Sequence, residues 1–103
     1  MAWLNVETGL GSGGMEIRCA GEVDVGTCAK LIDAFDRVFS GGVEAVRVDL
    51  RAVTFIDSTG IGCLLHGALK AEKLGTAFLV VPGAAVQRFI DVTGLGSALQ
   101  ITS

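Results

Sequence analysis

The chain has 103 residues, 50% of them hydrophobic, and a formal net charge of -3, which fits one compact domain over residues 1–103. A weakly acidic chain lacks the basic surface that phosphate contacts need, so direct nucleic-acid binding is not expected. The longest apolar runs, such as residues 77–81, are far shorter than the roughly 18 residues of a membrane-spanning helix. Cys19, Cys28 and Cys63 are odd in number and lie in apolar segments, so we expect reduced core thiols in a cytoplasmic protein without metal or cofactor.

The first half of the chain predicts a hairpin followed by a helix. Alternating apolar residues predict strands over residues 4–8 and 15–24, joined by the glycine-rich residues 9–14. That glycine run leads into a strand and not into a helix, so it indicates a hairpin connection and not a phosphate-binding loop. Helical spacing of apolar residues then predicts a helix that Thr27 caps and that the glycine pair at 41–42 ends.

The second half alternates strands and helices. Residues 46–50 predict a third strand, and a second helix follows and ends near Gly75. The apolar residues 77–81 are typical of a central strand covered on both faces. A third helix ends near Gly94, and residues 99–102 predict an edge strand. The order β-β-α-β-α-β-α-β predicts an α/β sandwich with a mixed sheet and about three or four helices.

Three oxygen-bearing side chains stand in a row at the start of the second helix, in the segment FIDSTGIG: Asp57, Ser58 and Thr59. In one interpretation, Asp57 or Ser58 only caps the helix. Capping does not explain Gly60 and Gly62, because each glycine costs a helix about 0.5–1 kcal/mol relative to alanine. We therefore expect a close approach at this helix start, either of the sheet below or of a partner above.

The helical phase of this segment predicts which side chains face outward. We expect Thr59, Gly62 and His66 to share one side of the helix, and the residues of the opposite, inward side are Ile61, Leu65 and Leu69. A small, flat, outward-facing surface around the cap follows from this phase.

Catalysis at this segment is not expected. A serine nucleophile at Ser58 needs a base, and His66 lies eight residues along the same helix, about 12 Å away. Asp24, Asp49 and Asp57 could be imagined as a magnesium cluster at strand ends, but solvated loop ends are the commoner explanation for such residues.

Covalent modification of Ser58 is the third interpretation. The positive end of the helix dipole favours an anion at a helix start, so an exposed hydroxyl there is a good phosphate acceptor. Phosphorylation would add about -1.5 to -2 charges beside Asp57. A partner packed flat against this surface would then have to bury an unpaired dianion, which opposes binding.

The chain resembles the STAS domain of bacterial anti-sigma factor antagonists in three segments: VRVDLRAVTFIDSTGIGCLL, AVQRFIDVTGL and the GEVD of residues 21–24. The resemblance implies a STAS-type sandwich and a binding protein that is not an enzyme. It also implies that Ser58 is phosphorylated by an anti-sigma factor that is itself a serine kinase. The unphosphorylated antagonist captures this kinase and frees a sigma factor, phosphorylation ends the capture, and a serine phosphatase restores it.

The same resemblance implies a partner-binding surface. Asp57, Thr59 and Gly60 would shape the loop around Ser58, Asp24 would lie beside it, and Gly62 falls on the flat outward side; Thr59 could also be a secondary acceptor. Two alternatives share this fold: a subunit of a stress-signalling complex, and a cytoplasmic accessory of a membrane transporter that does not itself insert into the membrane.

Overall fold

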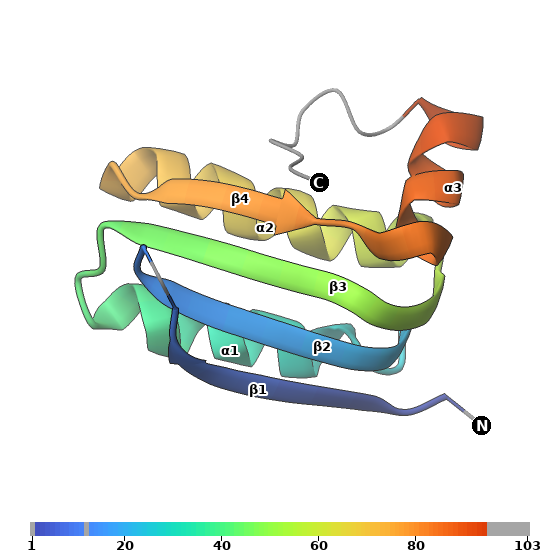
Figure 1. The fold of residues 1–103 in the computed structure, drawn as a ribbon, viewed down its shortest axis with the longest axis horizontal. Coiled ribbons are helices and arrows are strands. Elements are labelled where there is room, and N and C mark those ends of the chain that lie inside the picture. The colour runs from blue at the N-terminus through green and yellow to red at the C-terminus, as the bar shows by residue number, and fades with distance from the viewer. Residues whose placement is uncertain (1, 12, 95–103) are drawn as a thin grey trace.

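The computed structural model describes residues 2–11 and 13–94. Four strands form one sheet in the order β1-β2-β3-β4, and three helices pack against it (Figure 1). In chain order the elements are β1 (Leu4–Leu10), β2 (Met15–Val23), α1 (Cys28–Ser40), β3 (Ala45–Ile56), α2 (Ser58–Leu74), β4 (Ala77–Val81) and α3 (Gly83–Thr93). The predicted mixed α/β fold is confirmed; the strand expected over residues 99–102 lies outside the described residues.

The pairing of the strands determines where the loops meet. β1 and β2 form an antiparallel hairpin, whereas β2–β3 and β3–β4 are parallel pairs connected by α1 and α2. Parallel neighbours need a crossover, and both crossover helices lie on the same face, behind the sheet in Figure 1. Because Val23 pairs with Ile56, the loops that follow β2 and β3 leave the sheet side by side.

The core lies between the sheet and the α1–α2 layer. The apolar stripe of α1 buries Leu31 and Phe35 completely, and the Phe35 ring meets Phe78 of β4 edge to face at 5.6 Å. Gly67 of α2 packs directly on Phe35, where a Cβ would lie 2.7 Å from the ring. This contact lets the two helices approach closely, so the middle of α2 requires a residue without a side chain.

The structure corrects the predicted length of the third strand. β3 continues to Ile56, well past residue 50. The prediction stopped short because register shifts in the pairing with β2 interrupt the simple alternation in the second half of the strand. In the described part of the chain β4 pairs with β3 alone, and Leu79 is 36% exposed. Whether β4 is a central strand depends on the strand expected over residues 99–102, which lies outside the described residues, so this stays a prediction.

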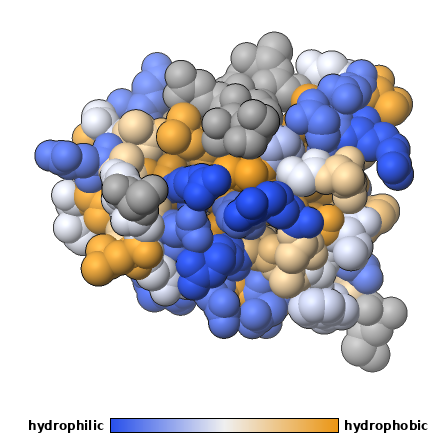
Figure 2. Space-filling model, viewed as in Figure 1, coloured by the Kyte–Doolittle hydropathy of each residue, from blue (hydrophilic) through white to orange (hydrophobic). Residues whose placement is uncertain are grey.

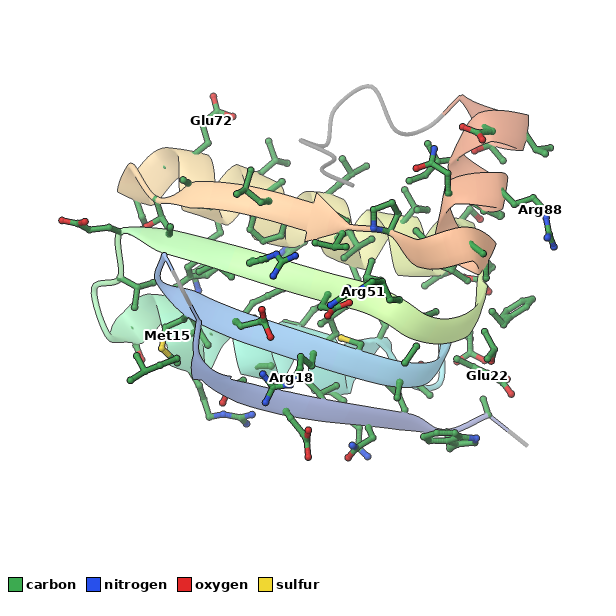
Figure 3. All side chains as sticks on the ribbon, viewed as in Figure 1. Met15, Arg18, Glu22, Arg51, Glu72 and Arg88 are labelled. Carbon is green, nitrogen blue, oxygen red and sulfur yellow. A yellow bond between two sulfur atoms is a disulfide. The ribbon has the colours of Figure 1, made fainter. Side chains whose placement is uncertain are left out.

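The open face of the sheet carries interleaved charges. Glu16 accepts hydrogen bonds from Arg18 and Arg47, at 2.9 and 3.2 Å. Figures 2 and 3 show this face: hydrophilic side chains gather across its middle, and Arg18 and Arg51 project from it. Among residues 2–11 and 13–94, no helix has the length and hydropathy that crossing a bilayer requires.

Candidate functional site

The start of α2 presents the Ser58 hydroxyl to solvent. Asp57 is the N-cap, with φ -123° and ψ -172°, and its Oδ1 accepts a hydrogen bond from the Gly60 N–H at 3.0 Å. Ser58 is the first helical residue and is exposed, and within the described residues no hydrogen bond engages its hydroxyl. Asp57 thus supplies the cap, and Ser58 is left available for chemistry.

The two glycines after Thr59 have different surroundings. Gly60 is buried, and a Cβ there would lie 2.6 Å from both the Val23 carbonyl oxygen and Ile56 Cγ1. Gly62 is exposed, and a Cβ there would meet nothing within 4 Å. The close approach expected at this helix start is therefore made by the sheet at Gly60, whereas Gly62 leaves the outer surface flat.

The loop before α1 is held by its own side chains. Asp24 Oδ1 accepts hydrogen bonds from the N–H groups of Gly26, at 2.9 Å, and Thr27, at 3.1 Å. The Thr27 hydroxyl donates to the Glu22 carbonyl oxygen at 2.7 Å and accepts from the Asp24 N–H at 3.0 Å. The prediction that Thr27 caps α1 is wrong for its side chain, because these bonds commit the buried hydroxyl to the loop.

These two helix starts form one candidate surface, which we call the acceptor surface and define by Asp24, Asp57, Ser58, Thr59 and Gly62. The β2–β3 register brings its two halves together, since Asp24 and Asp57 directly follow the paired residues Val23 and Ile56. Ser58, Thr59 and Gly62 are exposed, and both aspartates are half-buried. The surface is therefore acidic, small in its side chains and open to a protein partner.

Two exposed apolar residues border the acceptor surface and were missed at the level of sequence. Val25 directly follows Asp24 and is 80% exposed, and Phe55, two residues before Asp57, is 48% exposed. Phe55 pairs in register with Glu22, which Figure 3 shows at the same end of the sheet. A valine inside a polar loop was a usable signal, whereas the exposure of Phe55 depends on the irregular pairing of β3.

The outward side of α2 extends the surface along the helix. Thr59, Gly62 and His66 are exposed, as their helical phase predicted. Leu69 was expected to face inward, but it is 59% exposed and Leu65 is only partly buried. Leu69 follows His66 by three residues, so the two share one stripe of the helix, and the inward prediction for Leu69 is wrong.

Asp49 does not join Asp24 and Asp57. It lies within β3, where the Arg51 guanidinium donates to both of its carboxylate oxygens, at 3.0 and 2.7 Å. This pairing holds the pKa of Asp49 below its ordinary value. Over the part of the chain that the structure describes, no group of three acidic, histidine or cysteine residues could hold a metal ion.

The cysteines divide into a pair and a single thiol. A disulfide joins Cys28, the first residue of α1, to Cys63 in the second turn of α2. Cys19 is free and buried, and burial raises the pKa of its thiol to about 12. The prediction of reduced core thiols is therefore wrong for Cys28 and Cys63, because 35 residues of sequence separation hid the proximity of the two helix starts.

Comparison with known families and proteins agrees with this geometry. A family model described as "Mlab, STAS domain" matches residues 8–101. The anti-sigma-B factor antagonist of Staphylococcus epidermidis is 33% identical over 100 residues, which cover 95% of this chain and 92% of the relative. That of Staphylococcus aureus is 31% identical over the same shares. The chain belongs to the STAS domain family of anti-sigma factor antagonists.

Solved structures show the same fold. The crystal structure of an anti-sigma factor antagonist from Mycobacterium paratuberculosis superposes with a TM-score of 0.82 at 31% identity, over 96% of this chain and 85% of that chain. The unphosphorylated anti-sigma factor antagonist SpoIIAA superposes with a TM-score of 0.74 at 19% identity, over 96% and 89%. At the lower identity the likeness concerns the fold alone.

Proposed function

We propose that this chain is an anti-sigma factor antagonist that works in the cytoplasm by capturing an anti-sigma factor with serine kinase activity. Capture takes place at the acceptor surface and frees a sigma factor. Phosphorylation of Ser58 by the captured kinase ends the interaction, and a serine phosphatase restores it. The observation that carries the proposal is the exposed Ser58 hydroxyl at the start of α2, next to a cap that Asp57 already supplies.

Electrostatics gives this serine the properties of a switch. A phosphate on Ser58 would meet the positive end of the α2 dipole, so the fold should tolerate it. The same phosphate would stand beside the Asp57 carboxylate and close to Asp24, on a surface already acidic. A partner that covers the exposed Val25 and Phe55 would have to desolvate that dianion, which is costly without a matching cation.

The fold itself is compatible with phosphorylation. SpoIIAA has been solved in an unphosphorylated and in a phosphorylated form, and this chain superposes on both, with TM-scores of 0.74 and 0.69. The identity of 19% in each case restricts the likeness to the fold, so the assignment to Ser58 rests on the geometry of this chain.

Binding, and not catalysis, is the role that we assign to the chain. The serine that would act as a nucleophile is separated from His66 by eight residues of one helix, about 12 Å of rise. A general base must come within hydrogen-bond reach of the proton that it takes, so His66 does not activate Ser58. The kinase chemistry therefore belongs to the partner.

A quantitative pull-down from a lysate of the source organism tests the proposal. Wild type and Ser58→Ala should capture the same serine kinase, whereas Ser58→Glu should reduce its capture at least about tenfold, or about 1.4 kcal/mol. Ser40→Glu places the same charge on the exposed last residue of α1 and should bind like wild type. Equal capture by Ser58→Ala and Ser58→Glu would refute the electrostatic switch.

Phosphoryl transfer is then tested on the purified complex. With ATP added, mass spectrometry of wild type should locate phosphate on Ser58, and Ser58→Ala should remain unmodified. Phosphate on Thr59 in the Ser58→Ala variant would assign Thr59 as a secondary acceptor. No phosphate on either residue would contradict the proposed phosphorylation.

A transporter accessory is the second candidate. The fold of this chain also occurs in a murine anion transporter, Slc26a9, with a TM-score of 0.71 at 17% identity over 84% of this chain and 16% of that chain. Membrane-transport subunits captured equally by wild type, Ser58→Ala and Ser58→Glu would favour this candidate over the antagonist.

A further inference from the structure

The disulfide between Cys28 and Cys63 lies directly beneath the acceptor surface. Their Cα atoms are 6.3 Å apart, within the usual span of a disulfide. Cys28 follows Thr27, and its N–H donates to the Asp24 carbonyl oxygen at 2.9 Å. On the other side, Cys28 Sγ lies 3.9 Å from the carbonyl oxygen of Thr59. The bond therefore connects the Asp24 loop to the first two turns of α2.

The three cysteines differ in their capacity for redox chemistry. Cys28 is half-buried at the start of α1, where the helix dipole favours an anion, and Cys63 behind it is 3% exposed. Cys19 is buried in β2, and the pKa of about 12 that burial gives its thiol keeps it protonated and unreactive. One reachable thiol with a resolving thiol behind it is the arrangement typical of a redox-sensing pair.

We propose that Cys28 and Cys63 form a reversible disulfide that restrains the acceptor surface and slows phosphorylation of Ser58. This regulatory role rests on the proposed function of Ser58, whereas the formation of the disulfide and its effect on the helix start do not. Disulfides of cytosolic proteins are rare and are usually transient and redox-sensing, which suits a pair next to a regulatory serine.

The oxidant is hydrogen peroxide. The Cys28 thiolate attacks one peroxide oxygen, the O–O bond breaks, and a sulfenic acid and one water form after protonation. Cys63 sulfur then attacks the sulfenic sulfur of Cys28; the S–S bond forms, the S–O bond breaks, and the hydroxide takes up the Cys63 proton as a second water. A small dithiol reverses the process by thiol–disulfide exchange and returns two electrons.

The expected effect follows from how Ser58 must reach a kinase. In-line transfer requires the Ser58 oxygen to come within about 3–3.5 Å of the transferred phosphorus. The Ser58 hydroxyl is exposed, but its turn must still fit the active cleft of the kinase. Gly60 of that turn is packed between Val23 and Ile56, so any such adjustment shifts the start of α2 against the sheet. The Cys63 crosslink to α1 opposes this movement, because a crosslink restricts the open states of the segment that it closes.

Hydrogen exchange and mass spectrometry on the purified protein test the first half of the proposal. Hydrogen peroxide should remove the mass of two hydrogen atoms and create a Cys28–Cys63 crosslinked peptide. Amides at the start of α2 should then exchange at least about tenfold more slowly, and a small dithiol should reverse both changes. Cys19→Ala should behave like wild type, and both Cys28→Ser and Cys63→Ala should lose the response.

The second half of the proposal, the effect of the disulfide on phosphorylation, is tested with the serine kinase that Ser58→Ala captures from the lysate. Oxidised wild type should be phosphorylated at least about fivefold more slowly than reduced wild type, with no such difference in Cys28→Ser. Absence of the crosslink, or equal exchange in both redox states, would overturn the redox proposal and leave the Ser58 switch intact. Redox-dependent exchange without any phosphorylation of Ser58 would instead refute the proposed function and support the disulfide.

Discussion

The starts of α1 and α2 have similar chemical groups but use them differently. Each has an aspartate and a hydroxyl within a few residues, and the two lie side by side because β2 and β3 end in register. At α1 the residue Thr27 is 7% exposed, and its hydroxyl is engaged with Glu22 and Asp24. At α2 the Ser58 hydroxyl is exposed, and Asp57 alone performs the capping. Burial, and not residue type, separates a structural hydroxyl from one that a partner can modify.

The largest expected effect concerns the glycine on which the start of α2 rests. Gly60→Val should destabilise the protein by about 3 kcal/mol, because the new side chain overlaps the Val23 carbonyl group and Ile56. Gly62→Val is the matched control, since this position is open, and should change stability by less than about 0.5 kcal/mol. Urea unfolding of both variants measures the difference, and equal destabilisation would contradict the packing described for Gly60.

The structural role of Thr27 gives the next effect. Thr27→Val keeps the shape of the side chain but leaves the Glu22 carbonyl and the Asp24 N–H without their partner, so a loss of about 2 kcal/mol is expected. Thr59→Val makes the same change at an exposed position and should stay within about 0.5 kcal/mol of wild type. If thermal unfolding showed both variants equally stable, the contrast between the two helix starts would be lost.

The cap of α2 should contribute less. Asp57→Ala removes the acceptor of the Gly60 N–H and should cost about 1 kcal/mol of the free energy of unfolding. Asp57→Asn retains a capping oxygen and should cost only a few tenths of a kcal/mol. Chemical denaturation measures the free energy of unfolding of both variants. Equal values for Asp57→Ala and Asp57→Asn would show that the Asp57 side chain does not cap α2.

The smallest expected effect concerns the ion pair between Asp49 and Arg51, which lies within β3 and away from the acceptor surface. The bond to Arg51 lowers the pKa of Asp49, so its stabilisation is present above the ordinary aspartate pKa of about 4 and is lost as the pH falls through the folded-state pKa. Asp49→Asn should therefore cost less than about 1 kcal/mol at neutral pH, and this difference should shrink upon acidification. Thermal unfolding of both proteins from pH 7 to 3 measures it, and a difference that grows in acid would exclude this origin.

The sequence predicted those features that neighbouring residues determine. The ends of α2 were predictable from Asp57 and Gly75, because a cap and a left-handed glycine, here with φ 71°, act within one turn. The exposure of Ser58 followed from its place directly after the cap.

Features that depend on distant partners escaped prediction. The pairing of Cys28 with Cys63, 35 residues apart, is set by the parallel register of β2 and β3. The second half of β3 was missed for the same reason, since its pairing with β2 contains two irregularities. The Thr27 hydroxyl was missed for a local reason, since the Glu22 carbonyl oxygen near the end of β2 competes with the helix for it.

The parallel register of β2 and β3 also determines the distance between the two halves of the acceptor surface. Because Val23 and Ile56 are paired, the separation of the Asp24 loop and the α2 start is set by the spacing of adjacent strands, about 4.8 Å, and not by either loop. Inserting one residue near the end of β3 would move one half of the acceptor surface by about 3.3 Å and turn its side chains to the other face. Insertions in the glycine hairpin around residues 11–14, at the far end of β2, would leave this spacing unchanged. The distance between the two helix starts is therefore independent of the length of the hairpin.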